Sequence, residues 1–232
     1  MNSLLPSYFF DLSHYVHKKL FDLDDYVWKS LTNLESYFTE LSFERHEATV
    51  SPSAYLVNPE TIHLGRGSVV EPGAYIRGPC WIGENCVVRH GAYLRGFVVT
   101  GNHCVIGHDT EIIRSILLDH VHAAHFAYLG QTILGNYVNL GAGTKCANLK
   151  LNQETISILI EQQKIPTGLR KLGAIIGDYS QIGCNAVTNP GTLLGKHVHC
   201  HPALNCGGFI PSHQTIMSNA NIKIVNREPN GS

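Results

Sequence analysis

The stretch LGRGSVVEPGAYIRGPCWIGENCVVRHGAYL, residues 64–94, repeats with a period of six. An aliphatic residue returns at every sixth position, and from the second of these onward a small residue stands two positions before it. The aliphatic positions are Leu64, Val70, Ile76, Ile82, Val88 and Leu94, and the small ones are Ser68, Ala74, Cys80, Cys86 and Ala92. The aliphatic series is interrupted at Thr100, resumes at Ile106, Ile112 and Leu118, and returns at Ile176, Ile182 and Leu194.

A period of six excludes the common patterns of single helices and strands. An amphipathic helix would repeat its apolar residues about every 3.6 residues, and a half-buried strand would repeat them every 2 residues. A step of six fits one short strand and one turn, and stacking such steps about 4.8 Å apart lets each coil hydrogen-bond the next. The sequence therefore predicts an all-β parallel solenoid, with the periodic aliphatic side chains inside and Cys80, Cys86 and Cys104 as small core residues.

The composition indicates a folded, nearly neutral chain. It has 232 residues, 44% of them hydrophobic, and a formal net charge of −1 from 17 basic and 18 acidic residues. This balance gives no positive field, so neither nucleic acid nor a membrane surface is an expected partner. No apolar run approaches the roughly 20 residues of a membrane span, and no basic stretch precedes the apolar start. We expect a cytoplasmic protein whose seven cysteines are reduced thiols.

Three regions differ from the repeat. Residues 1–46 carry apolar residues at three-to-four spacing, which predicts a helical cap, and we expect it to cover an open end of the solenoid. The β-helix domain is predicted over residues 47–211, with an excursion loop at 149–173. Residues 212–232 are polar and predict a C-terminal tail. Inside the excursion, the alternation of Ile156, Ile158 and Ile160 favours a hairpin.

One segment carries a much more specific pattern. It is AAHFAYLGQTILGNYVNLGAGTKCANLK, residues 123–150, with HxxYLG followed by VNLGAGT and AN. It closely resembles a segment in the acetyltransferase domain of bifunctional N-acetylglucosamine-1-phosphate uridylyltransferases and of archaeal sugar-1-phosphate nucleotidylyltransferase/acetyltransferases. The stretch TGLRKLGAIIGDYSQIGCNA, residues 167–186, is more similar to the archaeal branch. Together with the repeat, the resemblance implies a left-handed β-helix of hexapeptide repeats that assembles as a homotrimer.

The resemblance also implies roles for individual residues. His125 would be the general base that takes a proton from a sugar amine as the amine attacks acetyl-CoA, and Asn139 would be a polar contact able to donate to the oxyanion. The implied substrate contacts are Arg95, Tyr128 and Asn148, and the implied contact with the acetyl thioester is Ala142. An amine needs such a base because an ammonium is not nucleophilic, and imidazole titrates near neutral pH.

The excursion supplies two further candidates. Arg170 and Lys171 follow Thr167 and Gly168 in a long departure from a regular scaffold, and such departures are often functional. We interpret Arg170 and Lys171 as phosphate-contacting residues for the cofactor. A solvated basic turn is the alternative.

The implied reaction is N-acetylation of an amino-sugar phosphate, with glucosamine-1-phosphate as the expected substrate, acetyl-CoA as co-substrate and no metal. Family members carry a lysine where this chain has Ile113, and Arg114 stands next to it. Adjacent residues on a strand face opposite sides, so Arg114 is not an automatic substitute, and the amino sugar stays open. No glycine-rich nucleotide-binding start is present, so pyrophosphorylase activity is not expected.

Two other classes of function remain open. Hexapeptide prisms include zinc-dependent carbonic anhydrases, and His103 with His108 could supply two of the three histidine ligands that such a site needs. A non-catalytic assembly subunit could keep the prism and lose the activity. The run His197, His199 and His201 could bind a metal, but a row of stacked polar side chains is the simpler explanation, and we favour it.

Overall fold

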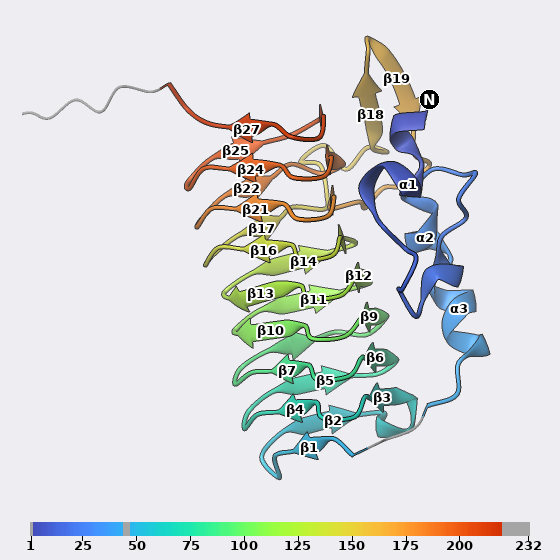
Figure 1. Ribbon diagram of the computed structural model, residues 1–232, viewed down its shortest axis with the longest axis vertical. Helices are drawn as coiled ribbons and strands as arrows, with labels where there is room; N and C mark the ends of the chain where they lie inside the picture. Colours follow the sequence, from blue (N-terminus) through green and yellow to red (C-terminus); the bar gives the residue numbers. More distant parts are fainter. Residues whose placement is uncertain (1, 44–46, 220–232) are drawn as a thin grey trace, which may run out of the picture.

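The computed structural model describes residues 2–43 and 47–219, and most of residues 47–219 form a parallel solenoid with three flat faces (Figure 1). Successive coils contribute strands to the three faces in turn, and within each face a strand pairs in parallel with the equivalent strand of the neighbouring coil. The predicted fold class, a solenoid of the left-handed β-helix type, is confirmed. None of the helices in the described ranges has the length and hydrophobicity needed to cross a bilayer.

The three faces are named here A, B and C. Face A contains β3 (Ile62–Leu64), β6 (Cys80–Ile82), β9 (Val98–Thr100), β12 (Ser115–Leu117), β15 (Ile133–Leu134), β20 (Ala174–Ile176), β23 (Thr192–Leu194) and β26 (Phe209–Ile210). Face B contains β1 (Thr49–Val50), β4 (Val69–Val70), β7 (Val87–Val88), β10 (Val105–His108), β13 (His122–His125), β16 (Asn139–Leu140), β21 (Gln181–Ile182), β24 (His199–Cys200) and β27 (Thr215–Ile216). Face C contains β2 (Tyr55–Val57), β5 (Tyr75–Arg77), β8 (Tyr93–Leu94), β11 (Glu111–Ile113), β14 (Tyr128–Gly130), β17 (Lys145–Cys146), β22 (Val187–Thr188) and β25 (Asn205–Cys206).

The interior is the predicted column of aliphatic side chains. On face C, for example, the buried Ile76, Leu94 and Ile112 stack on one another in register. The three cysteines of the repeat, Cys80, Cys86 and Cys104, are also buried in this core, as predicted. Burial raises the pKa of the Cys80 thiol to about 12, which keeps it protonated and unreactive.

The repeat loses one residue in the step after β11. Leu117 stands in register with Thr100 and is part of the interior column, whereas Leu118 packs on the outside against the N-terminal helices. The prediction that Leu118 continues the interior column is therefore wrong. A second step of five residues separates the interior Leu129 from Leu134. Both short steps fall at the corner between faces C and A.

The N-terminal helices pack along face A instead of covering an end of the solenoid (Figure 1). Their apolar side chains, such as Trp28 and Phe38, form one cluster with Val99, Ile116 and Ile133 on the outside of face A. The predicted position of the cap is wrong because the outward side chains of face A are themselves apolar and offer a larger surface to bury. The helices are η1 (Asn2–Leu4), α1 (Pro6–Phe9), η2 (Lys18–Leu20), α2 (Lys29–Thr32) and α3 (Leu34–Glu40), and η3 (Pro59–Thr61) lies within the first coil.

The excursion contains the hairpin that its alternating isoleucines predicted. Strands β18 (Ser157–Ile160) and β19 (Gln163–Pro166) pair antiparallel and project from the prism (Figure 1). Ile156 and Ile158 are buried in the cluster beneath the hairpin, which anchors it to face A. The solenoid continues beyond Pro211, since β27 pairs with β24. Residues 220–232 of the predicted tail lie outside the described residues.

Candidate functional site

His125 lies on an exposed corner of the prism. It is the last residue of β13, where the chain turns from face B to face C, and Ala123 fills the interior position of that strand. On the next coil, the Gly143 N–H donates to the His125 carbonyl at 3.0 Å. The structure therefore brings Ala142, which precedes Gly143, onto the coil stacked directly on His125.

Asn139 occupies the outward row of face B on that same coil. It begins β16 and stands in register with His122 on one side and Gln181 on the other. Its side chain is half-buried. Asn139 is thus one coil from His125 and three residues from Ala142, but no hydrogen bond joins its side chain to either of them in the part of the chain that the structure describes.

Tyr128 and Asn148 converge on face C, around the corner from His125. A Cβ added to Gly130 would lie 2.8 Å from the Tyr128 hydroxyl and would clash with the Asn148 amide. The Asn148 amide donates to the Gln131 side-chain oxygen. The absence of a Cβ at Gly130 therefore leaves room for the Tyr128 and Asn148 side chains. These two side chains form a polar patch on face C, and Tyr128 lies three residues after His125 in the sequence.

Arg95 lies two coils from Tyr128 on the same face. Its guanidinium donates to Glu111 at 2.7 Å, and this hydrogen bond is the main reason why the pKa of Arg95 is raised. Glu111 stands in register between Tyr93 and Tyr128. Sequence reasoning missed Glu111, although its place directly before the interior Ile112 predicts that it faces outward with Tyr128.

The position of the missing lysine is also on face C. Ile113 is half-buried and follows Arg95 in the outward row, one coil further on. Arg114 faces the N-terminal helices, where it pairs with Glu35 at 2.6 Å and lies 4.9 Å from the centre of the Phe97 ring. The Arg114 side chain is therefore bound to the N-terminal helices and does not replace the lysine.

Arg170 and Lys171 lie where the excursion returns to the prism. Both are exposed, and the backbone of Lys171 bridges to Leu149. The neighbouring Leu172 N–H donates to the Asn148 carbonyl at 2.9 Å. The base of the excursion is thus next to Asn148, but no hydrogen bond or ion pair joins Arg170 or Lys171 to His125 within residues 2–43 and 47–219.

The histidines considered as zinc ligands do not converge within one chain. His108 is the last residue of β10, whereas His103 lies two residues before the strand begins and stacks on His120 with ring centres 4.7 Å apart. In the described ranges, no group of three or more His, Cys, Asp or Glu side chains is placed to hold a metal. His197 belongs to a ladder of stacked rings along the corner between faces A and B, which consists of His103, His120, Tyr137, Tyr179, His197 and His213.

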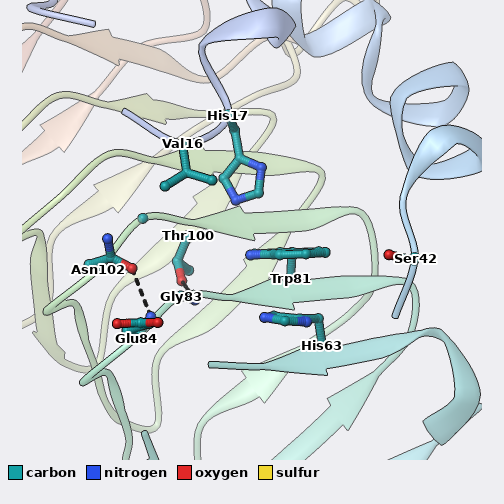
Figure 2. Close-up of a pocket in the computed structure, with 10 residues that line it drawn as sticks. Val16, His17, Ser42, His63, Trp81, Gly83, Glu84, Thr100 and Asn102 are labelled. Atoms are coloured by element: carbon teal, nitrogen blue, oxygen red, sulfur yellow. Dashed lines mark hydrogen bonds between the residues drawn. The ribbon is translucent and has the colours of Figure 1, made fainter. Parts of the chain in front are cut away.

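A separate cavity of about 540 Å³ lies between the cap and the prism (Figure 2). On its wall, His63 stacks on Trp81 and His17 meets the same indole edge-on, with ring centres 5.1 Å apart. The His17 Nδ1 lies 2.8 Å from the Tyr37 hydroxyl. Burial lowers the pKa of His17 to about 4, so this imidazole is neutral at pH 7 and anchors the cap. None of the predicted site residues lines this cavity.

Comparison with known proteins supports the resemblance seen in the sequence. The family model described as the GMPPB C-terminal domain matches residues 76–169. The bifunctional sugar-1-phosphate nucleotidylyltransferase/acetyltransferase of Sulfurisphaera tokodaii is 32% identical over 92 residues, which are 40% of this chain and 23% of that protein. The bifunctional protein GlmU of Methanococcus vannielii is 33% identical over 88 residues, or 38% of this chain and 21% of that protein. The resemblance to these bifunctional proteins is confirmed.

The similarity covers only part of these relatives, since the chain spans less than a quarter of the length of either. Among solved structures, the UDP-N-acetylglucosamine acyltransferase of Francisella novicida aligns with 75% of this chain and 67% of its own. The TM-score is 0.48 and the sequence identity 18%. The matched segment of residues 76–169 contains His125, Arg95, Tyr128 and Asn148.

Proposed function

We propose that the protein is an acetyl-CoA-dependent N-acetyltransferase that acts on an amino-sugar phosphate, with glucosamine-1-phosphate as the first substrate to test. One observation carries the proposal. His125 stands on an exposed corner, joined through its carbonyl to the Ala142–Gly143 coil, with the Tyr128 and Asn148 patch around the corner. This arrangement offers a base, a backbone surface for a thioester and polar contacts for a sugar within a few residues of one another.

The chemistry follows from these roles. The amine nitrogen of the sugar attacks the thioester carbonyl of acetyl-CoA, so that a C–N bond forms and the C–S bond breaks. His125 takes the proton that the nitrogen loses, and the same proton can then neutralise the departing coenzyme A thiolate. A positioned base of this kind contributes about 10² to 10⁴ in rate. Asn139 or a backbone N–H near Ala142 would donate to the oxyanion.

The remaining residues bind and orient the substrates. Arg95 would hold the sugar phosphate, because its planar fork can donate to two oxygens at once, and its bond to Glu111 keeps it in place on face C. Tyr128 and Asn148 would contact the sugar. Arg170 and Lys171, at the base of the excursion, would contact the phosphates of coenzyme A. We further propose a homotrimer that works in the cytoplasm without a metal and without pyrophosphorylase activity.

The test is a thiol-release assay with acetyl-CoA and a panel of amino-sugar phosphates. We expect thiol release with glucosamine-1-phosphate, and a loss of about 10² to 10⁴ in kcat/KM for His125→Ala. The matched control is His108→Ala, since His108 is in register with His125 one coil away and has no proposed role. The control should keep the parent rate.

Two outcomes would contradict the proposal. Thiol release by His125→Ala at the parent rate would remove His125 as the base. No acetyl transfer to any amine in the panel would favour a non-catalytic assembly subunit, a function that the presence of Ile113 in place of the lysine does not exclude.

A further inference from the structure

Two columns of outward side chains run along face C away from the proposed sugar site. In one column, Tyr55, Tyr75 and Tyr93 stand in register on three successive coils, and all three rings are exposed by at least 36%. The other column lies two residues further along each strand and contains Arg77 and Arg95 on neighbouring coils. Both columns start below Glu111 and Tyr128, so they extend the proposed site instead of forming a separate one.

The arginine column provides more positive charge than a single phosphate needs. Arg95 pairs with Glu111 through Nη1 at 2.7 Å, which leaves its other N–H groups for a phosphate. Arg77 is exposed, and no acidic side chain pairs with it within residues 2–43 and 47–219. It lies one coil, about 4.8 Å, beyond Arg95 on the side away from Tyr128. Two guanidinium groups in succession suit two successive phosphates, since each can donate to a pair of phosphate oxygens.

The tyrosine column provides flat aromatic surface beside the arginines, and Tyr55 extends it one coil beyond Arg77. Tyr75 and Tyr93 pack edge to face with ring centres 5.2 Å apart, and the Arg95 guanidinium lies 5.8 Å from the centre of the Tyr93 ring. Tyr55 is the most exposed of the three, at 65%. Exposed tyrosine rings are surfaces on which a nucleobase can stack.

Along the axis the sugar contacts come first, Arg95 and Tyr93 share one coil, Arg77 and Tyr75 share the next, and Tyr55 lies one coil beyond them. From Tyr128 to Tyr55 there are four coil steps, or about 19 Å. A sugar monophosphate would reach Arg95 and leave Arg77 and the lower tyrosines without a function. We infer that the acetyl acceptor is a nucleoside-diphosphate-linked amino sugar, with its diphosphate on Arg77 and Arg95 and its base on Tyr75 and Tyr55.

This inference rests on the proposed acetyl transfer and specifies its substrate class. It leaves the reaction unchanged, since the sugar amine still exchanges its proton for the acetyl group and coenzyme A still leaves as the thiol.

The experiment compares a UDP-linked 2-amino sugar with the corresponding amino-sugar 1-phosphate. We expect kcat/KM to be at least about tenfold higher for the UDP-linked substrate, as one additional set of charge-assisted hydrogen bonds would provide. Arg77→Ala should abolish this preference while it leaves kcat/KM for the 1-phosphate within about twofold. Tyr75→Ala should act in the same direction. The matched control, Arg66→Ala, removes an exposed arginine on another corner and should leave kcat/KM unchanged for both substrates.

A binding measurement separates this inference from the proposed function. Titration with uridine diphosphate alone should show binding that Arg77→Ala weakens about tenfold, whether or not acetyl transfer occurs. If acetyl transfer proceeds but uridine diphosphate does not bind and Arg77→Ala has no effect, the substrate inference is overturned and the proposed function stands. If Arg77→Ala or Tyr75→Ala instead changes the sedimentation of the protein, the two columns are contacts between copies of the chain, which also overturns it.

Discussion

At the scale of single residues, His125 is accessible because it ends its strand. Ala123 occupies the interior position two residues earlier, so the imidazole falls on the corner and not in the core. His17 illustrates the opposite environment. It is only 2% exposed, lies against Trp81 and Tyr37, and is held neutral by its burial. The two histidines therefore differ in exposure: His125 is accessible to a substrate, whereas His17 is a buried packing residue.

The buried His17 predicts that the protein loses stability in mild acid. The unfolded chain binds a proton at His17 near pH 6.5, and the folded chain does so only near pH 4. Between these values the unfolded state holds more protons, so stability is complete above pH 6.5 and falls as the pH drops toward 4. The expected loss is about 3 kcal/mol in the free energy of unfolding. Denaturant unfolding at a series of pH values measures it.

His17→Phe should remove most of this dependence, since a phenyl ring can keep the contact with Trp81 but cannot titrate. His14→Gln is the control, because His14 is exposed on the same loop. It should keep the pH dependence of the parent. Equal slopes for the parent and His17→Phe between pH 6.5 and 4 would show that another group is responsible.

Residue identity alone does not reveal these environments. The pattern around His125 is specific enough for sequence to single it out, but nothing in the local sequence distinguishes His17 from His14. Glu111 could have been found from its alternation with Ile112. The hydrogen bond between Glu111 and Arg95 could not have been predicted, because it depends on the register of two coils and joins residues 16 apart in sequence.

At the scale of elements, the coil spacing decides where the site residues meet. The period of six predicts the strands and the interior column well, because each interior side chain stacks on its equivalent one coil away. It fails at Leu118, because a corner can lose one residue while both flanking strands stay in register. Such a shift is visible only once pairing partners are known.

The contact between β10 and β13 depends on glycine at position 107. A Cβ there would overlap the backbone of Ala124, the residue before His125. We expect Gly107→Ala to cost about 2 kcal/mol in unfolding free energy, in the range of an overpacked core, and to lower activity by displacing β13. Thermal and denaturant unfolding together with the thiol-release assay measure both effects.

Gly168→Ala is the control for Gly107→Ala. Gly168 has a φ of +75° but no atom within 4 Å of an added Cβ, so only backbone strain of about 1 kcal/mol is expected. If both variants unfold at the same denaturant concentration and remain equally active, close approach at Gly107 is not what holds β13 in place.

At the scale of the whole molecule, the cap determines which faces remain free. Its helices cover face A, whereas faces B and C, which carry every proposed catalytic and sugar-binding residue, stay uncovered in one chain. The three-to-four spacing of the first 46 residues predicts helices, but it does not say which surface they cover. The surface that the helices cover is formed by residues distant in sequence, the outward apolar residues of face A such as Ile116 and Ile175.

Exposed faces B and C lead us to predict a trimer. A base on an open corner is surrounded by water, and a neighbouring prism packed against that corner would exclude this water. Sedimentation equilibrium should give a mass three times 25.5 kDa at micromolar concentration. A monomer with full activity under these conditions would contradict the expected assembly.

Chemical rescue of His125→Ala by free imidazole tests the central claim most directly, because the exposed corner leaves room for imidazole to take the place of the missing side chain. We predict that imidazole restores part of the lost acetyl transfer in His125→Ala and does not raise the rate of the parent or of Tyr128→Phe. Acetyl transfer by His125→Ala at the parent rate without imidazole would contradict the claim that His125 is the base.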